Sequence, residues 1–174
     1  MVDLDPQKSL VGWWKRRGRT DNPTIFEGID TASEAVEALS LDGWDWVFID
    51  TPPAFVHVIK DAIESCHLAV IPLRTSALDL IGSEDAVLMA RSSKTPHLCV
   101  INDAETKWAS TKSAQDYLLS SGVPLAKQII THRAAYLSAM ARGRVGPEVD
   151  RTNVTQAEID ALWSEILECL EAAH

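Results

Sequence analysis

Three polar side chains each follow a short apolar or alternating stretch, and their types suit the binding of a nucleotide. They are Asp5, Asp50 and Asn102. If the stretches are parallel strands, these side chains lie at the carboxyl ends, where open α/β sheets bind their ligands. Carboxylate oxygens hold Mg²⁺ or a water, and an asparagine amide can hydrogen-bond a base. The pattern therefore predicts a nucleotide site at one edge of a sheet.

The elements that must position these side chains are predicted from hydropathy patterns. Continuous apolar runs at 46–49, 67–71 and 98–101 are typical of strands buried on both faces of a parallel sheet. Between and after them, helical patterns occur at 31–41, 54–65, 77–92, 110–121 and 134–142. The alternation predicts an α/β fold, a mostly parallel sheet with helices on both faces, in a single domain over residues 1–174.

The last helix is predicted from a start signal and a stripe. Thr155 and Glu158 have the spacing of a capping box, in which each side chain bonds a backbone N–H of the first turn. The apolar stripe that follows comprises Ile159, Leu162, Trp163, Ile166, Leu167 and Leu170. We expect this helix to dock on the sheet, because its polar face is acidic and would oppose anionic lipid.

Composition limits the classes of function. The chain has 174 residues, 46% apolar, and a net charge of −9, which argues against a surface coated for nucleic acid. Basic residues still cluster at 15–19 and are spread over 133–151, so a local basic face remains open. There is no apolar run of about 18 residues for a membrane span. Three cysteines without zinc-ligand spacing predict reduced thiols in a cytoplasmic protein.

Two motifs in a fixed order carry a resemblance to a family. Asp3-Leu4-Asp5-Pro6-Gln7 resembles the switch I segment of ParA/MinD-type partition ATPases, and Phe48-Ile49-Asp50-Thr51-Pro52-Pro53 resembles their Walker B strand and switch II. This deviant Walker A group includes CbiA/CobQ-like domains. Val100-Ile101-Asn102 resembles the strand before the adenine, and 132–143 resembles the closing region of small orphan ParA-like proteins. The resemblance spans nearly the whole chain and implies a P-loop NTPase-like fold.

The resemblance also implies roles for the polar side chains. Asp5 would orient the attacking water as a catalytic residue, and Asp50 would act in catalysis and hold a water on Mg²⁺. Asn102 would bind the adenine. The alternatives are a turn aspartate before proline, a cap and a strand-end turn asparagine. DNA backbone contacts are implied for three arginines, whose alternative is a solvated surface: Arg133, Arg142 and Arg144.

The phosphate-binding loop of the family is not found in this sequence. Relatives begin with a strand, a Lys-Gly-Gly-x-Gly-Lys-Thr-Thr loop and a helix, whereas here Met1 falls within the second strand and no Gly-Lys pair occurs. We therefore expect a domain that lacks the first βα unit and does not bind the family's ATP and Mg²⁺ tightly. Because that first strand lies mid-sheet, we expect its two neighbours to close up or to pair with a partner chain.

Three functions follow from these expectations. The first is a ParA-like partition or positioning ATPase, for plasmid, chromosome or cargo, present without its phosphate loop. The second is a non-catalytic pseudo-ATPase that serves as a protein-interaction module. The third is a CobQ/CobB-like synthase domain, which lacks the expected amidotransferase domain. The partners implied by the resemblance are a second copy in a homodimer, a ParB-like activator and non-specific DNA, with no membrane.

Overall fold

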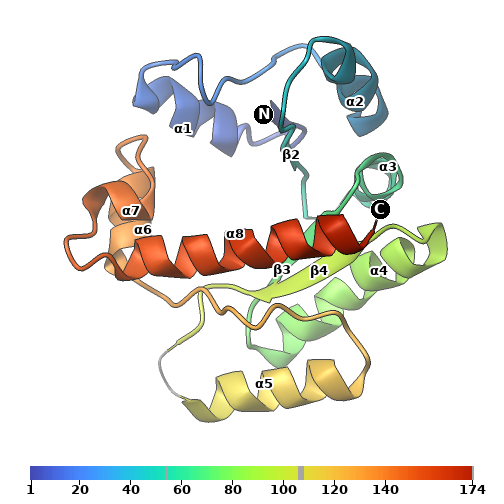
Figure 1. The fold of residues 1–174 in the computed structure, drawn as a ribbon, viewed down its shortest axis with the longest axis vertical. Helices are drawn as coiled ribbons and strands as arrows, with labels where there is room; N and C mark the ends of the chain where they lie inside the picture. The colour runs from blue at the N-terminus through green and yellow to red at the C-terminus, as the bar shows by residue number, and fades with distance from the viewer. Residues whose placement is uncertain (54, 106–107, 174) are drawn as a thin grey trace.

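The computed structural model describes residues 1–53, 55–105 and 108–173, and within them short parallel strands are surrounded by helices (Figure 1). The strands are β1 (Val2–Asp3), β2 (Ile49–Asp50), β3 (Ala69–Leu73) and β4 (His97–Ile101). The helices are α1 (Ser9–Arg17), α2 (Ala32–Leu41), α3 (Val56–Ser65), α4 (Ala77–Ser93), α5 (Trp108–Ser120), α6 (Ala134–Met140), α7 (Gly146–Val149) and α8 (Val154–Ala172).

The strands form two separate parallel pairs. β1 pairs with β2 in the register Val2↔Ile49, and β3 pairs with β4 from Ala69↔His97 onward. Helices cover both faces of the β3–β4 pair, with α8 on one side and α4 and α5 on the other (Figure 1). The predicted α/β class, with parallel strands and helices on both faces, is confirmed.

The outer edge of each pair is covered. Beyond β1, the Phe26 N–H donates to the Met1 carbonyl at 3.0 Å. Beyond β4, the Cys99 N–H donates to the carbonyl of Pro124 at 2.7 Å, and the segment continues to Ile130. Each pair also has an inner edge, formed by β2 in one pair and by β3 in the other.

The two inner edges, of β2 and β3, do not pair with each other. In the part of the chain that the structure describes, no backbone ladder joins them. The predicted closure of the two neighbours is therefore wrong for this chain by itself. Trp163 of α8 lies between the two strand pairs. The centroid of its ring is 4.8 Å from that of Trp46 and 6.3 Å from that of Phe48, so the two strand pairs meet through side chains.

The predicted strand at 46–49 is shorter than expected. Only Ile49 and Asp50 have strand geometry, because β2 pairs with just two residues of β1. Trp46 and Phe48 before them are 46% and 53% exposed. An apolar run predicts burial on both faces, whereas here these two side chains line the open cleft between β2 and β3.

Most helices lie where the patterns predict them. α4 begins after Ser76, whose hydroxyl accepts the Asp79 N–H at 3.2 Å as a cap. α6 ends at Met140, two residues earlier than predicted. The helix predicted from residue 54 begins at Val56, and Ala54 lies outside the described residues.

The predicted capping box at the start of α8 is wrong. Asp150, upstream of the helix, accepts the N–H of Thr155 at 2.9 Å and so provides the cap. Glu158 instead accepts hydrogen bonds from the Arg133 guanidinium at 2.7 and 3.0 Å and from the Tyr136 hydroxyl at 3.0 Å. A partly buried guanidinium is a stronger partner for a carboxylate than a backbone amide, which explains the difference.

A helix that crosses a bilayer needs about 20 predominantly apolar residues. Not one of the described helices combines enough length with enough apolar character to cross a membrane.

Candidate functional site

The two carboxylate-bearing motifs meet at the ends of paired strands. The register places Asp3 beside Asp50, and Asp5 follows two residues later. Burial raises the pKa of the Asp50 carboxyl, and the negative charges of Asp3 and Asp5 raise it further. The predicted placement of Asp5 and Asp50 at neighbouring strand ends is therefore confirmed, and Asp3 lies beside them.

Asp3 is buried and serves the adjoining helix. Its carboxylate accepts the backbone N–H of Val11 at 3.0 Å and that of Asp5 at 3.1 Å. Only 3% of the residue is exposed. Because the first turn of a helix has N–H groups without helical partners, a carboxylate here stabilises the start of α1. Asp3 therefore orders the segment that carries Asp5.

Asp5 has the geometry of a turn aspartate. Its side chain accepts the Gln7 N–H at 2.8 Å, and its carbonyl accepts the Lys8 N–H at 2.9 Å. The oxygen that accepts the Gln7 N–H is Oδ1. The contacts match the turn alternative, and a role in orienting water stays a prediction.

Asn102 stands at the end of β4 and is exposed. Its backbone N–H donates to the Leu73 carbonyl at 2.8 Å, which continues the β3–β4 ladder by one bond. Asn102 lines the same cleft as Thr51, the residue after Asp50. The cleft therefore connects the two strand ends that were predicted to share a ligand, and the contact with a base stays a prediction.

Sequence reasoning missed a cluster of charges beside Asn102. The Asp103 carboxylate lies 2.6 Å from the His132 Nδ1 and 3.3 Å from the Arg74 guanidinium. Arg74 directly follows β3 and Asp103 follows Asn102, so their places at two strand ends were the available signal. The cluster ties the ends of β3 and β4 to the segment before α6.

The three predicted DNA contacts have different surroundings. Arg133 is occupied by Glu158 and joins α6 to α8. Arg142 and Arg144 are exposed in the turn after α6, and the Arg144 carbonyl accepts the indole N–H of Trp13 at 3.0 Å. In the part of the chain that the structure describes, Arg133 forms an ion pair, and no such pair is found for Arg142 or Arg144. Contact with DNA stays a prediction for all three.

The turn after α6 also holds α1 against α7. Arg17 makes two hydrogen bonds of 2.8 Å to the Glu148 carboxylate. These bonds lower the Glu148 pKa to about 2. Gly143 lies so close to α1 that a Cβ there would collide with the backbone of Arg17. We call this contact, formed by Arg17, Gly143 and Glu148, the α1–α7 clasp.

The carboxylates of Asp3 and Asp5 at this strand edge already serve the fold, and the absence of tight MgATP binding stays a prediction. Over residues 1–53, 55–105 and 108–173, no three acidic, histidine or cysteine side chains come together as ligands. The carboxylates of Asp3 and Asp5 already accept backbone N–H groups. A phosphate cradle needs clustered backbone amides and a lysine, and the sequence has no Gly-Lys pair.

A cleft of about 1270 Å³ lies between β2 and β3. Trp163, Ile166 and Leu170 of α8 line one side. Side chains of α3 and α4 line the other, among them Ile59 and Met89. The cleft is thus walled by helices above and below and by a strand at each edge.

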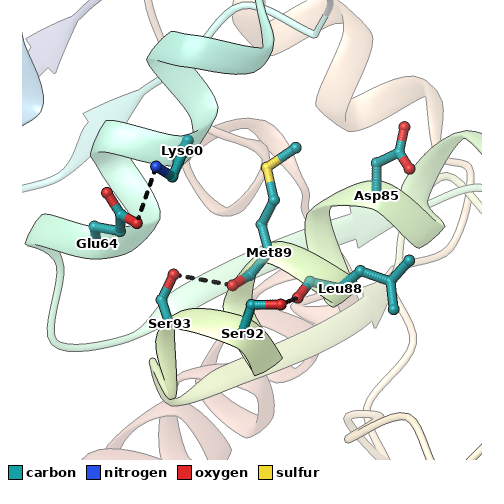
Figure 2. Close-up of a pocket in the computed structure, with 7 residues that line it drawn as sticks. All are labelled: Lys60, Glu64, Asp85, Leu88, Met89, Ser92 and Ser93. Carbon is teal, nitrogen blue, oxygen red and sulfur yellow. Dashed lines mark hydrogen bonds and ion pairs between the residues drawn. The ribbon is translucent and has the colours of Figure 1, made fainter.

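A second, smaller pocket of about 320 Å³ lies between α3 and α4 (Figure 2). Three charged residues line it, and two of them, Lys60 and Glu64, pair with each other at 3.5 Å, while Asp85 is the third. The hydroxyls of Ser92 and Ser93 donate to carbonyls one turn earlier in α4, at 2.8 and 3.0 Å. Four of its polar side chains are thus engaged within their own helices.

The short parallel strands and the helices around them define an α/β protein. No protein-family model matches the chain. The chain is similar to the Maintenance of carboxysome distribution protein A of Halothiobacillus neapolitanus, with 29% identity over 154 residues, covering 82% of this chain and 70% of that protein. This likeness supports the ParA-like resemblance carried by the two motifs.

Proposed function

We propose that this chain is a ParA-like positioning protein, which keeps a cellular cargo distributed. The observation that carries the proposal is the pairing of the two motifs, with Asp3 beside Asp50 at adjacent strand ends. The relative's name, which refers to carboxysome distribution, supports positioning as the role. We propose a large assembly of that kind as the cargo.

The finer features of the family are part of the same proposal. In a form that binds ATP, the protein would form a dimer around two nucleotides, respond to a ParB-like activator and hold DNA through Arg142 and Arg144. Such DNA binding would weaken as salt rises, because it depends on phosphate contacts. By themselves, residues 1–174 are proposed not to bind MgATP tightly, since acidic groups crowd the strand edge.

Positioning is tested in the cell that makes the protein. The gene is deleted, and the spacing of fluorescently labelled assemblies is measured before and after complementation. We expect clustered cargo in the deletion and restored spacing with the wild-type gene. Complementation with Asp50→Ala tests whether positioning depends on the carboxylate edge. If it does, this variant should fail to restore the spacing that the wild-type gene restores. Unchanged spacing of every labelled assembly in the deletion would refute the positioning role.

Nucleotide binding is tested separately with the purified chain. A fluorescent ATP analogue is titrated with and without Mg²⁺, and Asp50→Asn serves as the matched variant. We expect no saturation in the micromolar range. Micromolar binding that requires Mg²⁺ would overturn the proposed nucleotide incompetence and leave the positioning role to the cellular test.

A pseudo-ATPase that acts as an interaction module is the second candidate. The open cleft between β2 and β3 favours it, because apolar side chains exposed there suit a protein partner. This candidate predicts normal cargo spacing with Asp50→Ala and altered spacing when the cleft is blocked.

A further inference from the structure

The region around α6 presents exposed apolar side chains to solvent. Leu137 and Met140 lie one turn apart on this short helix, and their exposed fractions are 64% and 48%. Val145 in the turn that follows is also exposed. Single apolar residues are normal on a surface, but three within nine positions form a patch.

Two cations stand beside these apolar side chains. Arg142 and Arg144 are exposed in the same turn, and over the residues that the structure describes neither takes part in an ion pair. The neighbouring carboxylate of Glu148 is already bound by Arg17. We call Leu137, Met140, Arg142, Arg144 and Val145 together the basic patch.

α4 carries the opposite combination. Glu84, Asp85 and Leu88 lie within about one turn of one another, and Leu88 is 56% exposed. Asp85 and Leu88 line the smaller pocket (Figure 2). The exposed Tyr117 of α5 donates its hydroxyl to Glu84 at 2.9 Å and so extends the apolar area. We call Glu84, Asp85, Leu88 and Tyr117 the acidic patch.

The cations near the acidic patch are engaged elsewhere. Lys60 pairs with Glu64 at 3.5 Å, and Arg91 of α4 donates to backbone carbonyls just beyond α5. For the Asp85 carboxylate, no hydrogen bond or ion pair is found within the described part of the chain. The stretch 77–90 contains aspartates and a glutamate but no lysine or arginine. The patch is therefore negative.

We propose that the basic patch of one copy docks on the acidic patch of a second copy of this chain. Each patch has an exposed apolar part flanked by charge without an ion partner, and the two signs are opposite. Such complementarity favours association and fixes its orientation. The contact requires neither nucleotide nor DNA, and it goes beyond the proposed positioning function.

The places of the two patches determine the kind of assembly. α6 and α7 lie on one side of the molecule, and α3 and α4 on the other (Figure 1). Contact between two unlike surfaces is head-to-tail, so each added copy leaves one patch of each kind free. Because both patches are small, we expect weak association, with a Kd on the order of 100 µM.

Association is tested by sedimentation velocity of the purified chain without nucleotide or DNA, from about 10 µM to about 1 mM. We expect the mean mass to rise with concentration and to pass that of a dimer. Raising the salt concentration from about 0.05 M to about 0.5 M should weaken association several-fold, because exposed charges are screened. A monomer at every concentration would overturn the proposal, and so would a mass that stops at the dimer.

A charge exchange locates the contact. Asp85→Arg and Arg142→Asp each place like charges against each other, and each should weaken association about fivefold or more. The two changes together in one chain restore opposite charges, so association should return to within about twofold of the wild type. Single variants that associate as the wild type does, or a double variant that stays weak, would overturn the pairing of these patches.

Matched controls change the net charge equally at other exposed positions. They are Asp160→Arg on α8 and Arg151→Asp before it, and each should change association by less than about twofold. Equal losses in controls and patch variants would mean that only overall charge matters, and would overturn the proposal. Midpoints of urea unfolding show that each variant is folded.

The apolar part of the contact is tested without any change of charge. Leu137→Ser should weaken association about threefold or more, because less apolar area is buried. Its control is Leu41→Ser at the end of α2, where the leucine is 86% exposed and lies outside both patches. If Leu137→Ser has no larger effect than Leu41→Ser, the basic patch does not form the contact and the proposal is wrong.

Discussion

The two strand pairs of this molecule differ in how much of their structure the chain itself supports. β3 and β4 pair over five residues between α8 on one face and α4 and α5 on the other. β1 and β2 pair over two residues, and the predicted site residues Asp5 and Asp50 lie at their ends, close to Asp3. The longer pair supports the fold, and the shorter pair bears the site beside an open cleft.

The pairs are joined by side chains and by the α1–α7 clasp. Arg17 and Gly143 hold the helix after β1 against the turn after α6. Trp163 touches Trp46 and Phe48 across the cleft. These contacts hold the two strand pairs together without backbone pairing between β2 and β3. The carboxylate edge is therefore ordered although the sheet is not continuous.

The largest expected effect is a difference in the free energy of unfolding between variants of the two strand pairs. Ile101 in β4 is 1% exposed, and Ile101→Ala should lower the free energy of unfolding by about 3–4 kcal/mol through lost burial and a cavity. Ile49→Ala in partly exposed β2 should cost about 1–2 kcal/mol. Urea unfolding with unchanged m-values measures both losses. Equal losses would contradict the difference between the pairs.

The clasp is tested next, with two glycines of similar backbone geometry. Gly143 and Gly122 have φ of 65° and 67°, but a Cβ collides with the Arg17 backbone only at Gly143. Gly122→Ala should cost about 1 kcal/mol of stability from left-handed strain, and Gly143→Ala should cost about 2–3 kcal/mol. Thermal unfolding measures both. Similar shifts would show that the close approach of α1 contributes little.

How much of the fold and the site could be predicted from the sequence depends on how far apart in the sequence the interacting residues are. The helix at 77–92 and its cap at Ser76 were correctly predicted, because a cap involves residues three apart. The placement of Asp5 and Asp50 at neighbouring strand ends was correctly predicted too, since parallel strand ends meet at one edge. Both are consequences of local pattern and a general rule of sheets.

The features that were predicted wrongly depend on partners distant in the sequence. The Thr155 and Glu158 pattern predicted a local capping box, yet Glu158 binds Arg133, 25 residues earlier. The apolar run 46–49 predicted a full strand, but only two residues pair. Hydropathy reports that a segment is apolar and not which neighbour covers it, so the cleft could not be read from β2 or β3 alone.

An intermediate effect concerns the arginine that was predicted to contact DNA. Arg133→Met leaves Glu158, which is 7% exposed, as a buried carboxylate without its cation. We expect a loss of about 2 kcal/mol, below the value for fully buried pairs because the arginine is one-third exposed. Arg142→Met, on the exposed turn, should change stability by less than about 0.5 kcal/mol.

A gel-shift titration at low salt accompanies these unfolding measurements. If Arg133 serves the fold and Arg142 serves DNA, the first variant loses stability and the second loses DNA retention. A stable Arg133→Met protein with reduced DNA retention would reverse this assignment and place the DNA contact at α6.

The smallest effect probes the charge at the site edge. Burial and the neighbouring Asp3 and Asp5 raise the folded pKa of Asp50 above its model-peptide value of 3.8. The folded state therefore binds this proton more tightly, and stability falls as pH rises from 3.8 through the raised pKa. Asp50→Asn removes that loss, so we expect it to stabilise the protein at pH 7 by less than about 1 kcal/mol, because solvent screens a half-exposed group. Unfolding at pH 7 and at pH 3 measures the difference, which should vanish at the lower pH. A destabilised Asp50→Asn at pH 7 would show that the carboxylate is held by a favourable partner, and the shorter strand pair would then resemble the longer one in supporting its own charges.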